Sequence, residues 1–391
     1  MRRPQYTLTA RALHEQAASL CQRYLRLRDH GPKCTAHTLL LLLFYAAARL
    51  TSLAAACAAL AKAPSDQAVR DALRATLPPL FDLQRLLNRA LTAQLPKALR
   101  RRRQPLAIDL TLLPYHGQPC YLPEEIYRSQ PKSGTSHFHA YATAYVIRKG
   151  QRFTVALDYV LRGEALQDVV RDLLHQAARA GIRPRYVLLD RGFYSVGVIR
   201  YLQAARCPFL MPAPCRGRKA DHPQGPGGTR VFHLRKRGGW SRHTLRDASG
   251  RKATVGLCIQ CRNYRGAWRR HGRQTLVYAY WGLRPSSGRW VYQTYRLRFG
   301  IETTYRQLRQ ARIATSTRDP VLRLLFVGLA LILRNVWVWL HWEVLSHPHR
   351  GGRRLDLDQL PFRALLLWLQ HVAEALLEYC DETRADHPIL T

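Results

Sequence analysis

Two aspartates stand where an acidic side chain is costly. Asp109 interrupts the apolar, strand-like run Leu106–Leu113, and Asp190 follows the short apolar strand Tyr186–Leu189. A carboxylate inside an apolar strand raises the free energy of the folded protein unless it is paired or binds a cation. Open α/β sheets place their ligands beyond the carboxyl ends of the strands, which is where Asp190 stands. Each acid alone is explained equally well as a capped strand end, but two acids on neighbouring strands form a carboxylate pair.

A carboxylate pair of this kind is what phosphoryl transfer with two divalent cations requires. Carboxylate oxygens hold the two cations about 3.5–4 Å apart, where one cation activates the nucleophile and the other stabilises the leaving oxygen. The pair therefore predicts metal-dependent chemistry on a phosphate ester.

A third acid, Glu302, lies in a run that predicts a helix over Tyr292–Ile313. At 100° per residue, Glu302 shares a stripe within about 80° of arc with two tyrosines and two arginines, while leucine and isoleucine side chains gather on the opposite side. The other residues of the stripe are Tyr295, Arg298, Tyr305 and Arg309. A surface glutamate that bridges the two arginines would explain the charges, but it leaves the tyrosines unexplained.

The segments around the two aspartates predict an α/β core. Residues 101–205 predict three strands, a helix and a fourth strand, at 106–113, 137–148, 152–161, 165–180 and 186–189. Three strands, a crossover helix and a fourth strand are the order of the RNase H-like fold, a mixed sheet with flanking helices. We therefore expect an RNase H-like core that begins near residue 101.

Residues 1–100 differ from the strand-rich segment that follows, because their pattern is helical and they are rich in alanine and leucine. Within them, residues 51–61 and 65–75 predict two helices that begin after serine or threonine caps. This pair is compatible with a helix-turn-helix as well as with any other paired helices. We expect an all-α N-terminal domain for DNA binding or dimerisation.

Residues 206–291 predict a mainly β insertion between the second and third acids. Its strand candidates lie at 229–236, 254–261 and 275–281. Residues 292–345 are expected to return to the core with the helix of Glu302. Residues 346–391 predict a C-terminal helical segment.

The stretch Leu322–Leu345 has the composition of a membrane span but not its length. Its uninterrupted apolar run is only Leu324–Leu333, bounded by Arg323 and Arg334. A span requires about twenty apolar residues, and an arginine inside it is costly. We therefore predict a helix buried against the sheet that carries the acids, and no membrane partner.

Charge is the outlier of the composition. The 62 lysines and arginines outnumber the 25 aspartates and glutamates, which gives a formal net charge of +37 over 391 residues. A chain this basic needs an anionic partner, and nucleic acid or an anionic membrane surface is the usual one. A ribosomal-type protein, or one whose surface is merely basic, is the alternative interpretation.

The nine cysteines are scattered and odd in number, which argues against a disulfide framework and for a reducing compartment. Cys258-Ile-Gln-Cys261 is a lone C-x-x-C, and a structural zinc site would need a second pair. The cysteines therefore predict no disulfide framework and leave zinc binding by Cys258 and Cys261 open, and we expect a cytoplasmic protein.

Three segments together resemble a known family. The run Tyr295-x2-Arg298-x3-Glu302-x6-Arg309 resembles the Tyr-Arg-Glu-Lys signature of bacterial and archaeal insertion-sequence transposases, a superfamily of DDE transposases. Residues 186–194 resemble the family's second-acid segment, and Ala107-Ile-Asp-Leu-Thr resembles its first. The similarity extends over about residues 105–340, the β insertion included. The last signature position is normally lysine, and Arg309 keeps the charge but presents a planar fork instead of a point charge.

The resemblance implies a role for each singled-out residue. The catalytic positions, which would hold Mg²⁺ with Mn²⁺ as a substitute, are Asp109, Asp190 and Glu302. The positions that would contact transposon-end DNA are Tyr295, Arg298, Tyr305, Arg309 and Arg191. The last of these, next to the second acid, is also explained as a charge that balances it.

The implied reaction is metal-dependent cleavage at transposon ends followed by strand transfer of the 3′-hydroxyl into target DNA. The implied partner is double-stranded DNA, both the terminal inverted repeats and the target, bound by a homodimer in the nucleoid. Two alternatives share the same residues. One is an RNase H-like nuclease that cuts without joining, and the other is a non-catalytic DNA-binding derivative of a transposase.

Overall fold

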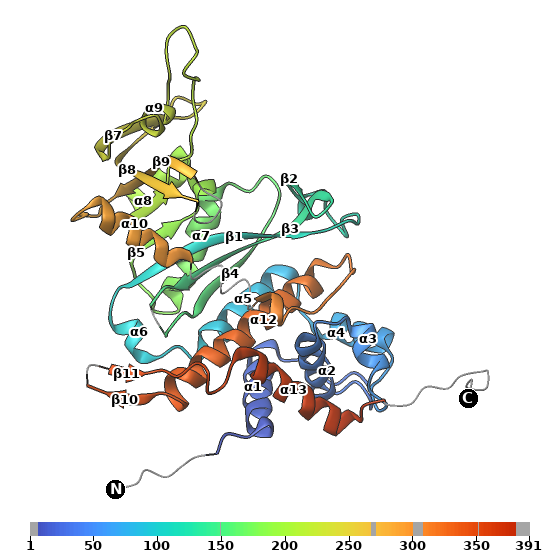
Figure 1. Ribbon diagram of the computed structural model, residues 1–391. Helices are drawn as coiled ribbons and strands as arrows, with labels where there is room; N and C mark the ends of the chain where they lie inside the picture. The colour runs from blue at the N-terminus through green and yellow to red at the C-terminus, as the bar shows by residue number, and fades with distance from the viewer. Residues whose placement is uncertain (1–6, 149, 267–270, 300–307, 351, 381–391) are drawn as a thin grey trace. The chain divides into compact units, whose positions relative to one another are not determined.

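The computed structural model describes residues 7–148, 150–266, 271–299, 308–350 and 352–380, with its elements labelled in Figure 1. The chain forms two compact units. The helical unit comprises Met1–Leu95, His116–Glu125 and Thr304–Thr391. The sheet unit comprises Pro96–Tyr115 and Ile126–Thr303.

The sheet unit is built on one mixed sheet of nine strands (Figure 1). The strand order is β2-β3-β1-β5-β6-β9-β8-β7, and β4 pairs with β3. The strands are β1 (Gln104–Pro114), β2 (Tyr127–Lys132), β3 (Thr135–Val146), β4 (Thr154–Val160), β5 (Pro184–Leu189), β6 (Phe209–Pro212), β7 (Gly239–Arg246), β8 (Lys252–Arg265) and β9 (His271–Trp281). Strands β1, β3 and β4 pair antiparallel, whereas β5 runs parallel to β1 and β6 parallel to β5.

The helices of the sheet unit complete the expected core. They are α6 (Lys97–Arg101), α7 (Leu166–Arg179), α8 (Val196–Ala204), α9 (Arg230–His233) and α10 (Gly288–Arg296). α7 connects β4 to β5 and packs its buried stripe, which includes Val169, Val170 and Leu173, on β3 and β4. Three antiparallel strands, a crossover helix and a strand parallel to β1 confirm the RNase H-like prediction.

The β-rich insertion is part of the same sheet. β6 pairs antiparallel with β9 from Phe209↔Trp281 to Pro212↔Tyr278, and β8 and β7 follow outward. The strands expected at 254–261 and 275–281 are present and longer, and β7 is an additional strand that the sequence did not predict. The insertion therefore extends the core sheet edge to edge.

The strand expected at 229–236 is wrong, because the structure has the short helix α9 there. The Thr229 side chain makes hydrogen bonds with the backbone of Pro214 and Arg216, which fixes the chain where α9 begins. Gly225 and Gly228, just before it, adopt positive φ angles that turn the chain. These local bonds override the strand preference of the residue types.

The single helix expected over 292–313 is also wrong. α10 begins earlier, after the cap Ser287, and ends at Arg296, where a 3-10 turn covers Leu297–Phe299. Residues 300–307, which include Glu302 and Tyr305, lie outside the described residues. Gly300 follows the turn in the sequence, and glycine is a poor helix former.

The helical unit packs N-terminal helices against C-terminal ones. Its helices are α1 (Ala10–Leu25), α2 (Ala36–Arg49), α3 (Leu53–Ala58), α4 (Asp66–Thr76), α5 (Leu80–Ala93), α12 (Pro320–Trp339), which continues as a π-helical turn over Leu340–Val344, and α13 (Phe362–Leu377). A short hairpin joins β10 (His347–His349) to β11 (Gly352–Arg354). Hydroxyl side chains cap the first four helices, as at Ser52 and Ser65.

The apolar helix α12 is a core helix of the helical unit. Among the described residues, one helix, Pro320–Val344, is long and apolar enough to cross a membrane, but 94% of its most apolar window is buried inside the protein. We expected the sheet to cover it, whereas its extensive packing is on α5, where Asn335 donates to the carbonyl of Leu91. Of residues 292–345, which were expected to belong to the catalytic core, the described residues 308–345 group with the N-terminal helices.

Candidate active site

Asp109 and Asp190 lie side by side at the end of the parallel pair β1 and β5. Ile108 on β1 is paired with Leu189 on β5, and in each strand the next residue is the aspartate. β5 ends at Leu189, whereas β1 continues and pairs Asp109 with Thr143 on β3. The Asp109 side chain is 18% exposed and that of Asp190 is 41% exposed. The register therefore brings together the two acids that the sequence singled out.

A guanidinium group contacts both carboxylates. Nη1 of Arg298 is 3.5 Å from Oδ2 of Asp109, and Nη2 is 2.9 Å from Oδ1 of Asp190. The shorter contact has the length of a charge-assisted hydrogen bond, and the longer one is an ion pair with weaker hydrogen bonding. The Arg298 side chain is only 11% exposed, so water screens these contacts little.

Helix α10 positions this arginine. Its buried residues Val291, Thr294 and Tyr295 form one face, and Arg298 follows on the 3-10 turn after the helix. The helix begins close against β8, because a Cβ at Gly288 would lie 2.6 Å from Nε2 of Gln260. The start of α10 therefore lies beside the Gln260 side chain of β8.

Two tyrosines hold Arg298 in place. Nε of Arg298 donates to the hydroxyl of Tyr295 at 2.9 Å, and the hydroxyl of Tyr145 on β3 donates to the backbone carbonyl of Arg298 at 3.3 Å. The Tyr295 ring is buried and lies 5.3 Å from the ring of Tyr278 on β9. The sequence did not single out Tyr145, because only the strand register places it here.

Burial and charge shape the titration of this cluster. Burial raises the pKa of Tyr295 to about 12, against the opposing effect of the Arg298 charge. Burial alone would lower the pKa of Arg298, but Tyr295 and the two carboxylates raise it, and the net shift is upward. The guanidinium is therefore charged and the phenol neutral at physiological pH.

The part of the chain that carries this site matches a known domain family. Residues 100–336, more than half of the chain, match the sequence model of the transposase DDE domain. The chain belongs to the DDE transposase family. The matched range contains both aspartates, Arg298 and the position of Glu302, and it confirms the expected transposase function and enzymatic character. DDE transposases depend on divalent metal ions, so this dependence holds for the transposase described here.

A solved structure shares the fold of the transposase. The cryo-EM structure of a piggyBac transposase synaptic complex with hairpin DNA superimposes with a TM-score of 0.55. The match covers 96% of this chain and 83% of that chain, at 12% sequence identity. No curated protein matches the transposase in sequence.

The donors at the carboxylate pair suit a divalent metal ion. Mg²⁺ and related hard cations take carboxylate oxygens, and Asp109 and Asp190 offer them at adjacent positions. The oxygens already face a positive group, the Arg298 guanidinium, so their arrangement accommodates a cation. Within the described part of the chain, no group of three or more histidine, cysteine, aspartate or glutamate side chains could hold a metal ion. The expected third ligand, Glu302, lies outside that part.

The remaining singled-out residues have other surroundings. The contact of Tyr295 and Arg298 with DNA stays a prediction, and in the structure Tyr295 contacts Arg298, which contacts both carboxylates. Arg191 is exposed on the 3-10 turn after Asp190. Arg309 is exposed and belongs to the helical unit.

The C-x-x-C pair does not form a chelate. Cys258 and Cys261 both lie on β8, and residues three apart on a strand point to opposite faces of the sheet. Cys258 is buried, whereas the Cys261 thiol lies 3.4 Å from the carbonyl of Arg235. The strand geometry therefore directs the two side chains to opposite faces of the sheet.

Proposed function

We propose that this transposase cleaves DNA at transposon ends and joins the freed 3′-hydroxyl to target DNA, with Mg²⁺ held by Asp109, Asp190 and Glu302. The observation that carries the proposal is the β1–β5 register, which sets two carboxylates side by side within the matched domain. When bound, the cations activate the attacking water and stabilise the leaving oxygen. The role of Glu302 rests on the signature and on the family match.

The proposed partner is double-stranded DNA, as terminal inverted repeats and as target. A net charge of +37 supports an anionic partner, and the piggyBac transposase of similar fold was solved with hairpin DNA. Because two ends must be held together for joining, we propose a homodimer on DNA. Arg191 and Arg309, both exposed, are proposed to contact phosphates, and Tyr305 completes this set by resemblance.

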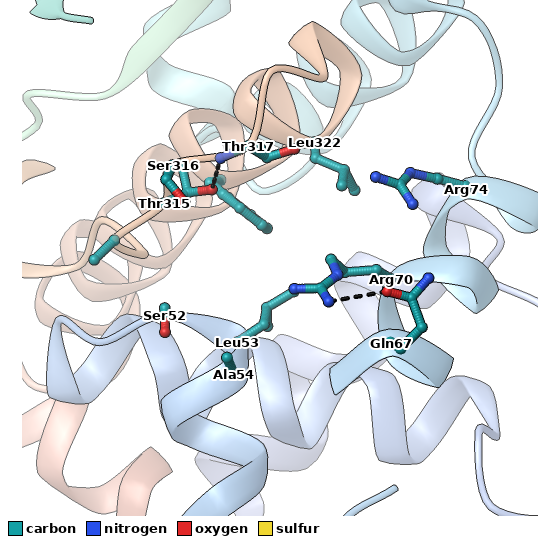
Figure 2. Close-up of a pocket in the computed structure, with 12 residues that line it drawn as sticks. Ser52, Leu53, Ala54, Gln67, Arg70, Arg74, Thr315, Ser316, Thr317 and Leu322 are labelled. Atoms are coloured by element: carbon teal, nitrogen blue, oxygen red, sulfur yellow. Dashed lines mark hydrogen bonds between the residues drawn. The ribbon is translucent and has the colours of Figure 1, made fainter. Parts of the chain in front are cut away.

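The helical unit offers a cavity for such contacts, lined by both apolar and polar side chains. Its volume is about 410 Å³, and Figure 2 shows the side chains that line it. Gln67, Arg70 and Arg74 on α4 share one helix face, because they are three and four residues apart. Across the cavity lies the segment Thr315–Thr317, so hydroxyl groups face guanidinium groups.

The cavity arginines have partners that they can exchange at small cost. Nη1 of Arg70 is 2.7 Å from Oδ2 of Asp66, and Arg74 lies 3.5 Å and 3.6 Å from Asp71 and Asp319. The side chains of Arg70 and Arg74 are 34% and 48% exposed, and exposed pairs such as those with Asp66 and Asp71 contribute about 0–1 kcal/mol. Asp319 is only 8% exposed, so its contact with Arg74 is not such a pair. We propose that a DNA phosphate replaces Asp66 and Asp71 at the arginines, which makes the N-terminal helices a DNA-binding domain.

Substitution of one ligand tests the catalytic proposal. Asp190→Asn is nearly isosteric and removes one charge from the carboxylate pair, so the fold and the binding of end DNA should survive. Cleavage with Mg²⁺ or Mn²⁺ should fall by several orders of magnitude, measured on labelled duplexes that carry a transposon end. Asp172→Asn is the matched control, because this acid on α7 is 44% exposed and lies outside the site.

Three outcomes separate the candidate functions. Asp190→Asn that cleaves at the rate of the Asp172→Asn control would refute the carboxylate site. Wild-type protein that cleaves but forms no strand-transfer product would be the nuclease alternative. Wild-type protein that binds end DNA without metal-dependent cleavage would be the non-catalytic derivative.

A further inference from the structure

The Arg298 guanidinium contacts one oxygen of each carboxylate that would hold a divalent cation. Each Nη faces one carboxylate, at Oδ2 of Asp109 and Oδ1 of Asp190, and the side chain is almost excluded from water. Two carboxylates at adjacent register positions repel each other, and a shared positive charge offsets that repulsion. In this arrangement Arg298 therefore has the electrostatic role of a counter-ion.

This counter-ion competes with a metal ion for the same ligands. A carboxylate lone pair that accepts an N–H bond is not available for coordination in that direction, and a guanidinium beside a divalent cation adds charge repulsion. Coordination of a cation through Oδ2 of Asp109 and Oδ1 of Asp190 thus requires the two Nη contacts of Arg298 to be given up.

The arginine has an anchored stem and an exchangeable end. Nε stays bonded to the buried hydroxyl of Tyr295, and the backbone carbonyl of Arg298 stays bonded to Tyr145. Neither bond involves a carboxylate, so the two Nη groups can change partners while the stem is held. A phosphate suits them, because the planar fork of a guanidinium matches two phosphate oxygens.

We propose that Arg298 is a built-in counter-ion that links the two ligands of the enzyme: it holds Asp109 and Asp190 in the absence of DNA, and it passes to a DNA phosphate when the carboxylates bind metal. This inference rests on the proposed function of the same site. Metal binding and DNA binding then strengthen each other, because each ligand removes a competitor of the other.

The alternative role for Arg298, as a residue that orients the aspartates, predicts the opposite change in metal affinity when the arginine is removed. If Arg298 stays in place and merely orients the aspartates for the metal ion, removing it weakens metal binding. If it is the competing counter-ion, removing it strengthens metal binding, because the bound cation then relieves the carboxylate repulsion left behind. The affinity of the DNA-free protein for Mn²⁺ therefore decides between the two roles without any measurement of activity.

The experiment titrates Mn²⁺ into the full-length protein and measures free Mn²⁺ by electron paramagnetic resonance, with and without duplex DNA. Arg298→Gln is expected to bind Mn²⁺ about tenfold more tightly than the wild type without DNA, a size typical of coupled sites. DNA should tighten Mn²⁺ binding by the wild type and change that of Arg298→Gln little. Arg298→Lys, whose ammonium cannot make two parallel contacts, should shift the affinity in the same direction by a smaller factor.

Arg296→Gln is the matched control. Arg296 is exposed at the end of α10, two residues away, and its side chain contacts the Tyr292 ring and not the carboxylates. Arg296→Gln also removes one positive charge near the carboxylates. An effect on Mn²⁺ affinity that comes only from the loss of nearby charge should therefore appear in both variants.

Arg298→Gln that binds Mn²⁺ no more tightly than Arg296→Gln would overturn the inference while leaving the proposed function intact. The inference is overturned equally if Arg298→Gln unfolds and Arg298→Lys fails to tighten Mn²⁺ binding. Wild-type protein that binds no Mn²⁺ even with DNA would instead remove the proposed metal site itself.

Discussion

The hydroxyl of Tyr295 is the acceptor that anchors Arg298, and Tyr295→Phe deletes it while keeping the ring. The bond from Nε is 2.9 Å long and Tyr295 is 5% exposed, so water does not replace the lost acceptor readily. A hydrogen bond to a charged group contributes about 1.5–3 kcal/mol. We therefore expect the sheet unit to lose about 1.5–3 kcal/mol of unfolding free energy.

The assay is thermal unfolding by scanning calorimetry, with the transition of the sheet unit followed. For a unit of this size, each kcal/mol corresponds to about 2–4 °C, so the midpoint should fall by about 3–12 °C. The pKa of Tyr295 is raised to about 12, so the phenol is neutral throughout the neutral range and the loss should be constant between about pH 6 and pH 9.

Tyr292→Phe is the control for this prediction. The Tyr292 ring lies 3.5 Å from the guanidinium carbon of Arg262, but its hydroxyl has no hydrogen bond with another described residue. Its removal should change the midpoint by less than about 2 °C. Equal shifts in the two variants would refute the reasoning that the Tyr295 hydroxyl anchors the arginine.

Two further predictions concern the helical unit. Arg70→Gln combined with Arg74→Gln should weaken duplex DNA binding in a fluorescence anisotropy titration, and should reduce the slope of log affinity against log salt by about 1–2, one for each lost phosphate contact. Burial, helped by the nearby His37, lowers the pKa of His14 to about 4. Because this folded-state pKa lies below the unfolded value near 6.5, the contribution of neutral His14 is complete above about pH 6.5 and is lost as the pH falls towards 4. Urea titrations should show that His14→Gln removes about 3 kcal/mol of that acid sensitivity.

Each of these predictions has its own control. Arg11→Gln combined with Arg85→Gln removes two charges from exposed ion pairs on α1 and α5, and an equal fall in DNA affinity would assign the effect to net charge alone. For His14, the comparison is the stability lost by each protein between pH 7 and about pH 4.5. Equal losses in the wild type and in His14→Gln would contradict the assignment.

The carboxylate pair could be predicted from the sequence because its signals are local. Asp109 is conspicuous as an acid inside an apolar strand, and Asp190 as an acid at the end of one. Their adjacency followed from the expected order of strands and helix, which the structure reproduces.

The partners of Arg298 could not be predicted in the same way. The expected stripe requires one helix through residue 313, and a regular 100° step fails where α10 ends at Arg296. The carboxylates that Arg298 contacts lie 189 and 108 residues earlier in the chain, and no local pattern encodes such pairings.

For α12, burial could be predicted from the sequence, but its packing partner could not. A helix that is apolar on all sides is expected to be buried, and it is. Its sequence does not say what covers it. The structure shows a close approach to α5, since a Cβ on Gly328 would lie 2.6 Å from the methyl groups of Leu87. Such complementarity is a property of two surfaces together.

The edge-to-edge pairing of β6 with β9 has a mechanical consequence. Four consecutive residue pairs, from Phe209↔Trp281 to Pro212↔Tyr278, join β9 to β6, and β6 is paired in turn with β5 of the core, so strands β7 to β9 cannot swing as a rigid body about a linker without breaking a ladder. Any displacement of β7 to β9 is instead an elastic twist shared along the strands. Because the start of α10 lies against β8, a twist of β8 would also shift α10 and the turn that carries Arg298. A displacement of strands β7 to β9 would therefore change the contacts of Arg298 with Asp109 and Asp190.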